Sequence, residues 1–182
     1  MNVPAEVVEY DPRWPLWFAE IRARLTPYLA QVPHSIDHVG STAVPGLAAK
    51  PIIDLDVVVP TSVQVPAAID GLVAAGYQHE GDLGIAGREA FRMPADSPHH
   101  HHLYVVVEGN KAHQDHVLLR DHLRRDAVDR ERYAALKREL AHLLATDRSA
   151  YVEAKAELVE ELIDAARPHG SGPAADRGRS DP

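Results

Sequence analysis

The sequence predicts an α+β domain in which helices pack, mostly on one side, against a mixed β-sheet. An apolar, β-branched run at 52–59 indicates a strand buried on both faces. Alternating residues at 88–93 and an apolar stretch at 103–107 indicate further strands, whereas residues 111–166 show helical spacing. We therefore expect the order helix, strand, turn, strand, helix, two or three strands and three helices.

Composition bounds the class of protein. With 182 residues, 45% of them hydrophobic and 25% charged, the chain is sized for one soluble globular domain with a real core. The net charge of −8 argues against broad binding of nucleic acid, which needs a basic surface. The lack of cysteine excludes disulfides, thiolate zinc sites and cysteine nucleophiles.

Targeting signals are not evident in the sequence. No apolar run approaches the roughly eighteen residues of a membrane span, and the start does not resemble a signal peptide. We expect a cytoplasmic protein without membrane contact. Residues 1–167 form the expected domain, and residues 168–182, which lack apolar periodicity, form an expected disordered tail.

The first third of the chain shows one helix and one short strand before the apolar run. Residues 3–9 alternate weakly and suit an edge strand or an extended arm. Residues 15–31 repeat apolar side chains at helical spacing, with Pro27 bending or ending the helix. A short strand is expected at 34–39.

The middle of the chain begins with a helix at 65–75 that ends at Gly76. A strand or connection follows at 76–80. The glycine-rich residues 81–87 suit either a mobile lid or a plain hairpin connection.

Two basic residues share a face of the strand predicted at 88–93. Alternation places Arg88 and Arg92 on the same side. Guanidinium groups match phosphate oxygens, so both arginines are candidate triphosphate ligands; a solvated strand face is the alternative.

Four consecutive histidines, 99–102, precede the apolar stretch at 103–107, a position that argues against an affinity tag. Alternation places His100 and His102 on one face, and we expect His99 and His101 on the surface. His100 or His102 is a candidate metal ligand, base or phosphate contact. Simple exposure of the run is the alternative.

The predicted C-terminal helices carry polar pairs at helical spacing. His113 and His116 are interpreted as a polar helix face because no partner is evident. Tyr133 pairs with Lys137, and Tyr151 with Lys155, four residues apart on one face. We interpret these pairs as packing with a surface charge, although Lys155 could reach a phosphate.

Two acidic residues interrupt the apolar run. Asp54 and Asp56 are two residues apart on a strand, so their side chains point the same way, with Cβ atoms roughly 6 to 7 Å apart. Like charges that close need compensation, and a divalent cation is the simplest. Carboxylate ligands on a rigid strand suit Mg²⁺ or Mn²⁺. The turn at Gly40-Ser41 upstream offers backbone donors and a hydroxyl to a phosphate.

A Gly-Ser turn followed by Asp-x-Asp in an apolar strand resembles the metal-binding signature of the DNA polymerase β-like nucleotidyltransferase superfamily. The fuller string from His38 to Asp54, with Lys50-Pro51 near its end, is similar to the hallmark of the GrpB family within that superfamily. The opening Tyr10-Asp-Pro-x-Trp14 also resembles this family.

The resemblance covers about residues 7 to 166 and implies a nucleotidyltransferase-like fold and metal-dependent transfer from a nucleoside triphosphate to an unknown small-molecule acceptor. It implies Mg²⁺, or Mn²⁺, on Asp54 and Asp56, with a histidine in place of the third carboxylate that is usual in the superfamily. A neutral imidazole adds no charge, so Mn²⁺ or Zn²⁺ would be tolerated better than Mg²⁺. The expected roles are catalysis by Asp54, Asp56 and His102; phosphate binding by Gly40, Ser41, Lys50, Arg88 and Arg92; and metal binding by Asp54, Asp56, His100 and His102.

Two other classes of function remain open. One is a nucleotide- or anion-binding module that has this fold and little or no catalysis. The other is a histidine and aspartate zinc hydrolase, which the absence of a tight His-x-x-x-His motif disfavours. Nucleotide base, acceptor and oligomeric state are not indicated by the sequence.

Overall fold

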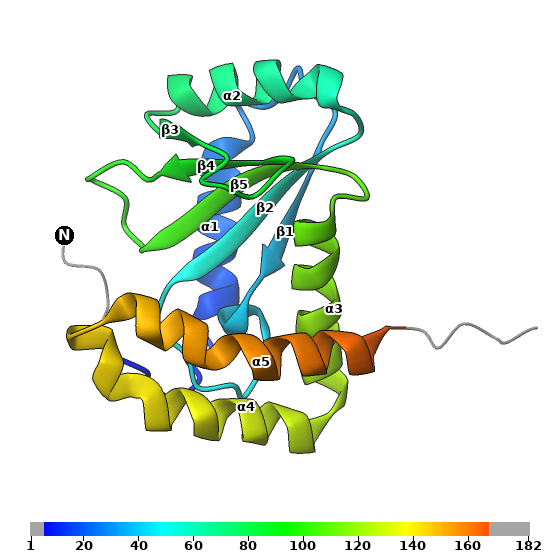
Figure 1. Cartoon of the computed structure of the whole chain (residues 1–182). Helices are drawn as coiled ribbons and strands as arrows, with labels where there is room; N and C mark the ends of the chain where they lie inside the picture. The colour runs from blue at the N-terminus through cyan, green and yellow to red at the C-terminus, as the bar shows by residue number, and fades with distance from the viewer. Residues whose placement is uncertain (1–5, 168–182) are drawn as a thin grey trace, which may run out of the picture.

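The computed structural model describes residues 6–167 (Figure 1). The expected disordered tail, residues 168–182, lies outside the described residues. The helices are α1 (Trp14–Leu25), α2 (Val65–Ala74), α3 (Lys111–Arg125), α4 (Ala127–Glu139) and α5 (Arg148–Ala166). The strands are β1 (Ser35–Val39), β2 (Ile53–Val59), β3 (Gln78–Gly81), β4 (Arg88–Arg92) and β5 (His101–Val107). Short 3₁₀ turns occupy Ser41–Ala43, Ser62–Gln64 and Leu140–Ala145.

The sheet is mixed, as predicted, with strand order β1-β2-β5-β4-β3. Strands β2 and β5 are parallel, and the other neighbours are antiparallel. The register pairs Asp54 with His102 and Asp56 with Tyr104. Paired residues on neighbouring strands share a face, so these four side chains project from the same side of the sheet.

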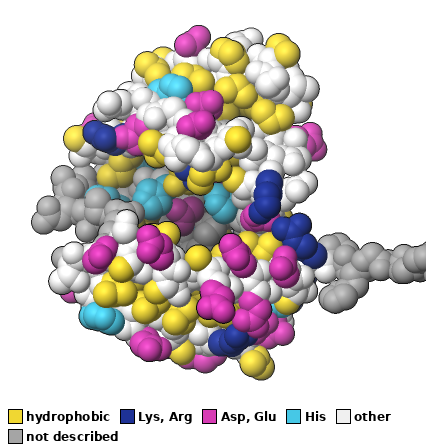
Figure 2. All heavy atoms as spheres, viewed as in Figure 1, with side chains coloured by type: hydrophobic (Ala, Val, Ile, Leu, Met, Phe, Trp, Pro, Cys, Tyr) yellow, Lys and Arg dark blue, Asp and Glu magenta, His cyan; other side chains and the backbone are white. Residues whose placement is uncertain are grey.

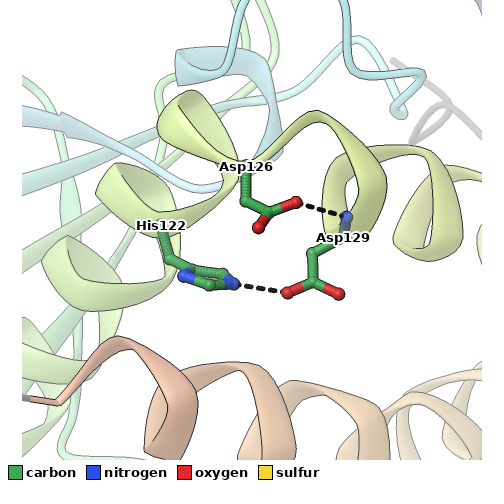
Figure 3. Close-up of side chains that lie close together, drawn as sticks. All are labelled: His122, Asp126 and Asp129. Carbon is green, nitrogen blue, oxygen red and sulfur yellow. Dashed lines mark hydrogen bonds and ion pairs between the residues drawn. The ribbon is translucent and has the colours of Figure 1, made fainter.

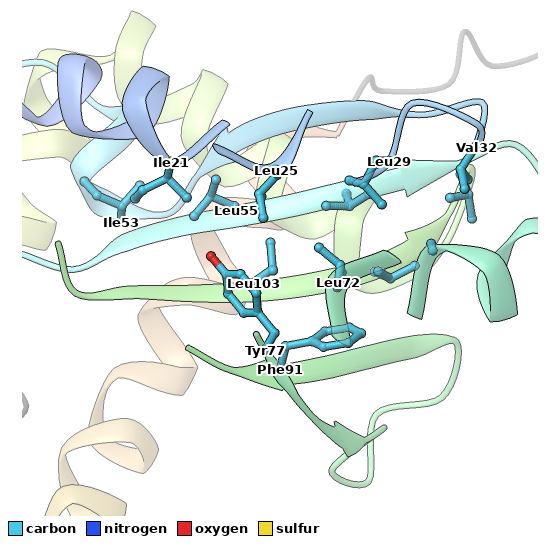
Figure 4. Packing of buried hydrophobic residues seen from close by; sticks show 14 of the residues in the cluster. Ile21, Leu25, Leu29, Val32, Ile53, Leu55, Leu72, Tyr77, Phe91 and Leu103 are labelled. Carbon is cyan, nitrogen blue, oxygen red and sulfur yellow. The ribbon is translucent and has the colours of Figure 1, made fainter. Parts of the chain in front are cut away.

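The main hydrophobic core lies on the opposite face of the sheet, against α1 and α2 (Figure 4). Alternate residues of β2 and β5 point into it, together with a row of residues from α1 and the turn after it. The labelled members are Ile21, Leu25, Leu29, Val32, Ile53, Leu55, Leu72, Tyr77, Phe91 and Leu103. Period-two alternation therefore separates a mainly apolar face from the face that carries the aspartates.

Helices cover both faces of the sheet, so the prediction that they lie mostly on one side is wrong. Helix α3 lies against the aspartate face, where its histidines contact Asp56. Its contact with that face is polar and therefore lacks the apolar stripe that indicates a sheet-covering helix in a sequence. Helices α4 and α5 cross one end of the sheet (Figure 1), and α5 packs against α3 and α4.

Local signals set the element ends. Helix α1 stops at Leu25, earlier than the predicted 15–31, just before Thr26-Pro27. The N-terminal arm makes an antiparallel bridge between Val8 and Ala49.

Within residues 6–167, no helix has the length and apolar character needed to span a bilayer.

Candidate functional site

Asp54 stands at the start of β2 beside two hollows that share part of their walls. Its side chain is 29% exposed, and its Oδ1 atom accepts a hydrogen bond of 2.8 Å from Nδ1 of His102. Cavities of about 220 and 170 Å³ both border Asp54, Ser41 and Lys155. Figure 2 shows a recess between the sheet and the C-terminal helices, with acidic and histidine side chains inside it. Asp54 is therefore accessible to a ligand.

Gly40 fixes the turn against Asp54. Its φ of 71° lies in the left-handed region, which favours glycine. A Cβ atom at this position would lie 2.8 Å from Cγ of Asp54 and closer still to Oδ2. Only a residue without a side chain lets the turn and the carboxylate approach this closely, which places Ser41 beside Asp54 at the cavity wall.

Asp56 shares the face of Asp54, as predicted, but its side chain is 0% exposed. His113 and His116 of α3 both donate from Nδ1 to Oδ2 of Asp56, at 2.9 and 2.8 Å. The other oxygen, Oδ1, is buried without a hydrogen-bond partner among the described residues. The two aspartates therefore differ: Asp54 opens to the cavities, and α3 covers Asp56.

The pKa values of Asp56 and His116 shift in opposite directions, each toward the charged form of the group. Burial raises the pKa of the Asp56 carboxyl, but hydrogen bonds from His113 and His116 outweigh burial and leave the pKa below its ordinary value. Burial lowers the pKa of His116, but the bond to Asp56 and the charges of Asp56 and Asp54 outweigh it and raise the pKa. The pair holds α3 to the sheet, and removing His113 and His116 would leave the buried Asp56 carboxylate without these donors.

Three lysines surround the cavity of about 220 Å³, which also borders Asp54 and His102. We call this the lysine cavity: Lys50, Lys137 and Lys155 with Ser41. The Nζ atoms of Lys50 and Lys155 lie 5.7 and 4.5 Å from the ring centroid of Tyr151. A pocket lined by three amines and one carboxylate suits an anion that binds together with a cation.

Lys137 is the buried member of this set, with 2% of its surface exposed. Its Nζ atom lies 4.6 Å from the ring centroid of Tyr133 and has no hydrogen-bond partner among the described residues. Burial, helped by the charges of Lys155 and Arg138, lowers the pKa of Lys137 to about 7. The expectation that Lys137 is a surface charge is therefore wrong, because the side chain turns inward at the cavity wall.

The two predicted arginines lie apart from the lysine cavity. The guanidinium carbon of Arg88 lies 4.5 Å from the ring centroid of Tyr104, on the sheet face that α3 covers. Arg92 is exposed and forms an ion pair of 2.5 Å with Glu80. Neither borders the cavities around Asp54, so their role with phosphate stays a prediction.

The four histidines of the run, residues 99–102, lie in different environments. His102 bonds Asp54, and His100 borders a separate cavity beside it. His99 stacks on Trp17 and bonds Glu20.

His101 is not a surface residue, contrary to expectation, because β5 alternation turns it toward the core. It is 5% exposed, donates from Nδ1 to the carbonyl of His99, and accepts at Nε2 from the hydroxyl of Tyr77. Burial lowers the pKa of His101 to about 4, which keeps the ring neutral.

The donor chemistry at β2 fits a divalent cation. Asp54 offers an open carboxylate, Asp56 has an orphaned buried oxygen, and His102 adds an imidazole. Mixed oxygen and nitrogen donors suit Mn²⁺ better than they suit Mg²⁺. Bringing both carboxylates onto one ion requires the imidazoles that now bond them to rearrange.

A different group has converging metal-type donors among residues 6–167: His122, Asp126 and Asp129 (Figure 3). Its internal bonds account for this geometry. Asp126 caps α4 by accepting from the backbone of Val128 and Asp129, and His122 bonds Asp129 at 2.6 Å. We interpret this group as the joint between α3 and α4.

Sequence reasoning missed His113, His116 and Lys137. The histidines lie three residues apart on α3, a spacing that marks one helix face but does not say which face meets the sheet. The four-residue spacing of Lys137 from Tyr133 indicated that the two share a helix face. Burial of the Lys137 amine, however, depends on how α4 and α5 pack near the turn at Ser41.

Comparisons with known proteins agree with this fold. A family model described as GrpB protein matches residues 4–165. The UPF0157 protein YqkA of Bacillus subtilis is 33% identical over 162 residues, which are 89% of this chain and 47% of YqkA, so the chain spans about half of that relative. The crystal structure of GrpB from Enterococcus faecalis superposes with a TM-score of 0.78 at 29% identity, covering 88% of this chain and 96% of that one.

A more distant solved structure has the same fold. The Cid1 poly(U) polymerase, in a structure with MgGTP bound, superposes with a TM-score of 0.54 over 74% of this chain and 44% of Cid1. The sequences are 17% identical, so this likeness concerns the fold alone. The nucleotidyltransferase-like arrangement of sheet and helices is thereby confirmed.

Proposed function

Because the chain belongs to the GrpB family and has the fold of a nucleotide polymerase, we propose that it transfers a nucleotidyl group from a nucleoside triphosphate to a small-molecule hydroxyl. One observation carries the proposal. A single cavity joins the open carboxylate of Asp54 to the amines of Lys50, Lys137 and Lys155. Triphosphate transfer needs this combination, with a carboxylate for the cation and amines for the phosphates.

The lysine cavity supplies the triphosphate site. Lys137 holds at its wall a buried amine that no hydrogen bond from residues 6–167 engages, and an anion near this amine would favour its charged form. Ser41 adds a hydroxyl beside Asp54. Arg88 and Arg92 lie outside this cavity, so the lysines are the principal phosphate ligands we propose.

Asp54 would hold the divalent cation, with Asp56 and His102 beside it. When bound, a cation of this kind neutralises triphosphate charge and strengthens the electrophile. His102 has Nδ1 engaged by Asp54, so Nε2 is the nitrogen that can accept a hydrogen bond from an acceptor hydroxyl. In the transfer, the acceptor oxygen bonds to the α-phosphorus, the bond to pyrophosphate breaks, and the hydroxyl proton passes to Nε2.

The experiment that tests this proposal combines nucleotide binding with turnover. Thermal unfolding with each nucleoside triphosphate and Mn²⁺ or Mg²⁺ should show stabilisation of about 2.7 kcal/mol at a hundred times Kd. Pyrophosphate release with a panel of small alcohols should fall about a hundredfold or more in Asp54→Asn. Glu108→Gln, an exposed carboxylate after β5, is the matched control and should keep activity. Absence of both stabilisation and release would refute the proposal.

Helix α3 covers Asp56, and this favours a second candidate function, a nucleotide-binding module without turnover. With Asp56 bonded by His113 and His116, Asp54 is the member of the β2 aspartate pair that is open to a cation. Stabilisation by nucleotides without pyrophosphate release, unchanged across acceptors and metals, would support this alternative over transfer.

A further inference from the structure

A second hollow adjoins the candidate site on the other side of His102. It has a volume of about 480 Å³, more than twice the 220 Å³ of the lysine cavity, and a size typical of small-molecule sites. His102 and Ile52 border both hollows. The imidazole of His102 is thus a shared wall between them.

The walls of this second hollow differ in chemistry from the lysine cavity. Phe91, Met93 and Pro94 supply an apolar surface. Its acidic and guanidinium side chains, Glu80 and Arg92, are bonded to each other at 2.5 Å, so each offsets the charge of the other; His100, His101 and His102 complete the polar part of the wall. A charged ligand would lose hydration here without gaining a free counter-charge, whereas an apolar body would gain from burial.

We propose that this hollow, which we call the acceptor cavity, binds a small uncharged alcohol with an apolar ring, and that its hydroxyl meets Nε2 of His102. The inference rests on the proposed function, because it assigns the acceptor of the same transfer. The two hollows then divide the substrates by charge: the triphosphate lies among lysines, and the alcohol lies against Phe91 and Met93. At the shared wall His102 links the two hollows, because its Nδ1 bonds the Asp54 carboxylate.

The chain carries a natural reporter for this cavity. It has two methionines, Met1 and Met93, and Met93 lines the cavity. Labelling methionine methyl groups with ¹³C therefore gives at most two NMR signals from the full-length protein. The probes are 2-phenylethanol and cyclohexylmethanol, with phenylacetate and 2-phenylethylammonium as charged analogues.

We expect the two alcohols to shift the Met93 signal in a saturable way and the charged analogues to bind at least tenfold more weakly. Ala95→Trp, at an exposed position of the cavity rim, should weaken alcohol binding at least tenfold. Val152→Trp, at an exposed position bordering the lysine cavity, is the matched control and should leave alcohol binding unchanged. Nucleotide binding, measured by thermal unfolding, should be weakened by Val152→Trp and left unchanged by Ala95→Trp.

The outcomes separate this inference from the function on which it rests. If nucleotides bind and no alcohol shifts the Met93 signal, the acceptor cavity is refuted and the transfer proposal stands. Tighter binding of a charged analogue than of the alcohols overturns the assigned ligand class. Equal alcohol binding in the wild type and in Ala95→Trp overturns the assigned cavity. If alcohols bind and nucleotides do not, the proposed transfer fails, and the acceptor role fails with it.

Discussion

Replacing the buried Lys137 by methionine should stabilise the protein while weakening triphosphate binding. The pKa of Lys137 falls from 10.5 to about 7 because its amine is buried. At about 1.4 kcal/mol per pKa unit, this corresponds to a cost of about 4 kcal/mol at pH 7. Methionine has a similar shape and loses only the contact with Tyr133, worth about 1 to 2 kcal/mol. The net gain in unfolding free energy should be about 2 to 3 kcal/mol.

The gain should also depend on pH in a defined direction. Between pH 7 and 10.5 the unfolded chain binds a proton at Lys137 that the folded chain does not, so wild-type stability rises with pH across this window. The advantage of Lys137→Met should therefore shrink toward pH 10.5. Below pH 7 both states bind the proton, and the advantage should stay constant.

Urea unfolding at pH 7 and pH 9.5 measures this difference, and isothermal titration with a nonhydrolysable triphosphate measures binding. Lys111→Met is the control, because Lys111 is exposed and its ion pair with Asp115 lies at the surface, so its loss should change stability by about 0.5 kcal/mol or less. Loss of stability in Lys137→Met at pH 7, or unchanged triphosphate affinity, would refute the assignment of Lys137 as a buried amine facing the ligand.

Three further predictions concern the geometry around Asp54 and Asp56 and the buried ring of His101. Gly40→Ala should lower unfolding free energy by about 2 kcal/mol or more in urea titrations, because a Cβ collides with Asp54 in a left-handed turn. Unfolding free energy should fall by about 3 kcal/mol as pH drops from 6.5 to about 4, because the unfolded chain protonates His101 and the folded chain does not. Replacing His113 and His116 by leucine should cost about 3 to 5 kcal/mol, measured by urea unfolding, because the Asp56 carboxylate then lacks its donors.

Matched variants isolate each cause. Gly84→Ala has a similar φ of 79° and open space around it, so an equal loss in both alanine variants would contradict a collision with Asp54. His101→Gln should flatten the acid slope and the exposed His142→Gln should not; identical slopes would exclude His101 as its source. Adding Asp56→Leu to the leucine variant should restore stability, and a further loss would contradict the buried-charge account.

Residues along a single element were predictable because backbone geometry fixes their spacing. The apolar run at 52–59 identified β2, and the period of two placed Asp54 and Asp56 on one face without knowledge of the fold. The same rule placed His100 and His102 on one face of their own strand, and the structure shows that His102 lies next to Asp54 in the β2–β5 register. Element order followed for the same reason.

Contacts between elements were not predictable in this way. Spacing placed His113 and His116 on one side of α3 but could not say that this side meets Asp56. The two-residue alternation of β5 could have predicted that His101 is buried, but the histidines on either side of it suggested an exposed run. The burial of Lys137 depends on residues far away in the chain, including Ser41, Lys50 and Tyr151, which line the same cavity.

The most direct test of the central claim is the coupling between cation and triphosphate at Asp54. Isothermal titration of a nonhydrolysable triphosphate, with and without Mn²⁺, measures it in the wild type and in Asp54→Asn. We predict that Mn²⁺ raises the wild-type affinity at least tenfold and leaves the Asp54→Asn affinity unchanged. Equal affinity with and without Mn²⁺ in the wild type, or an equal gain in Asp54→Asn, would contradict a site in which Asp54 and the lysines act on one ligand.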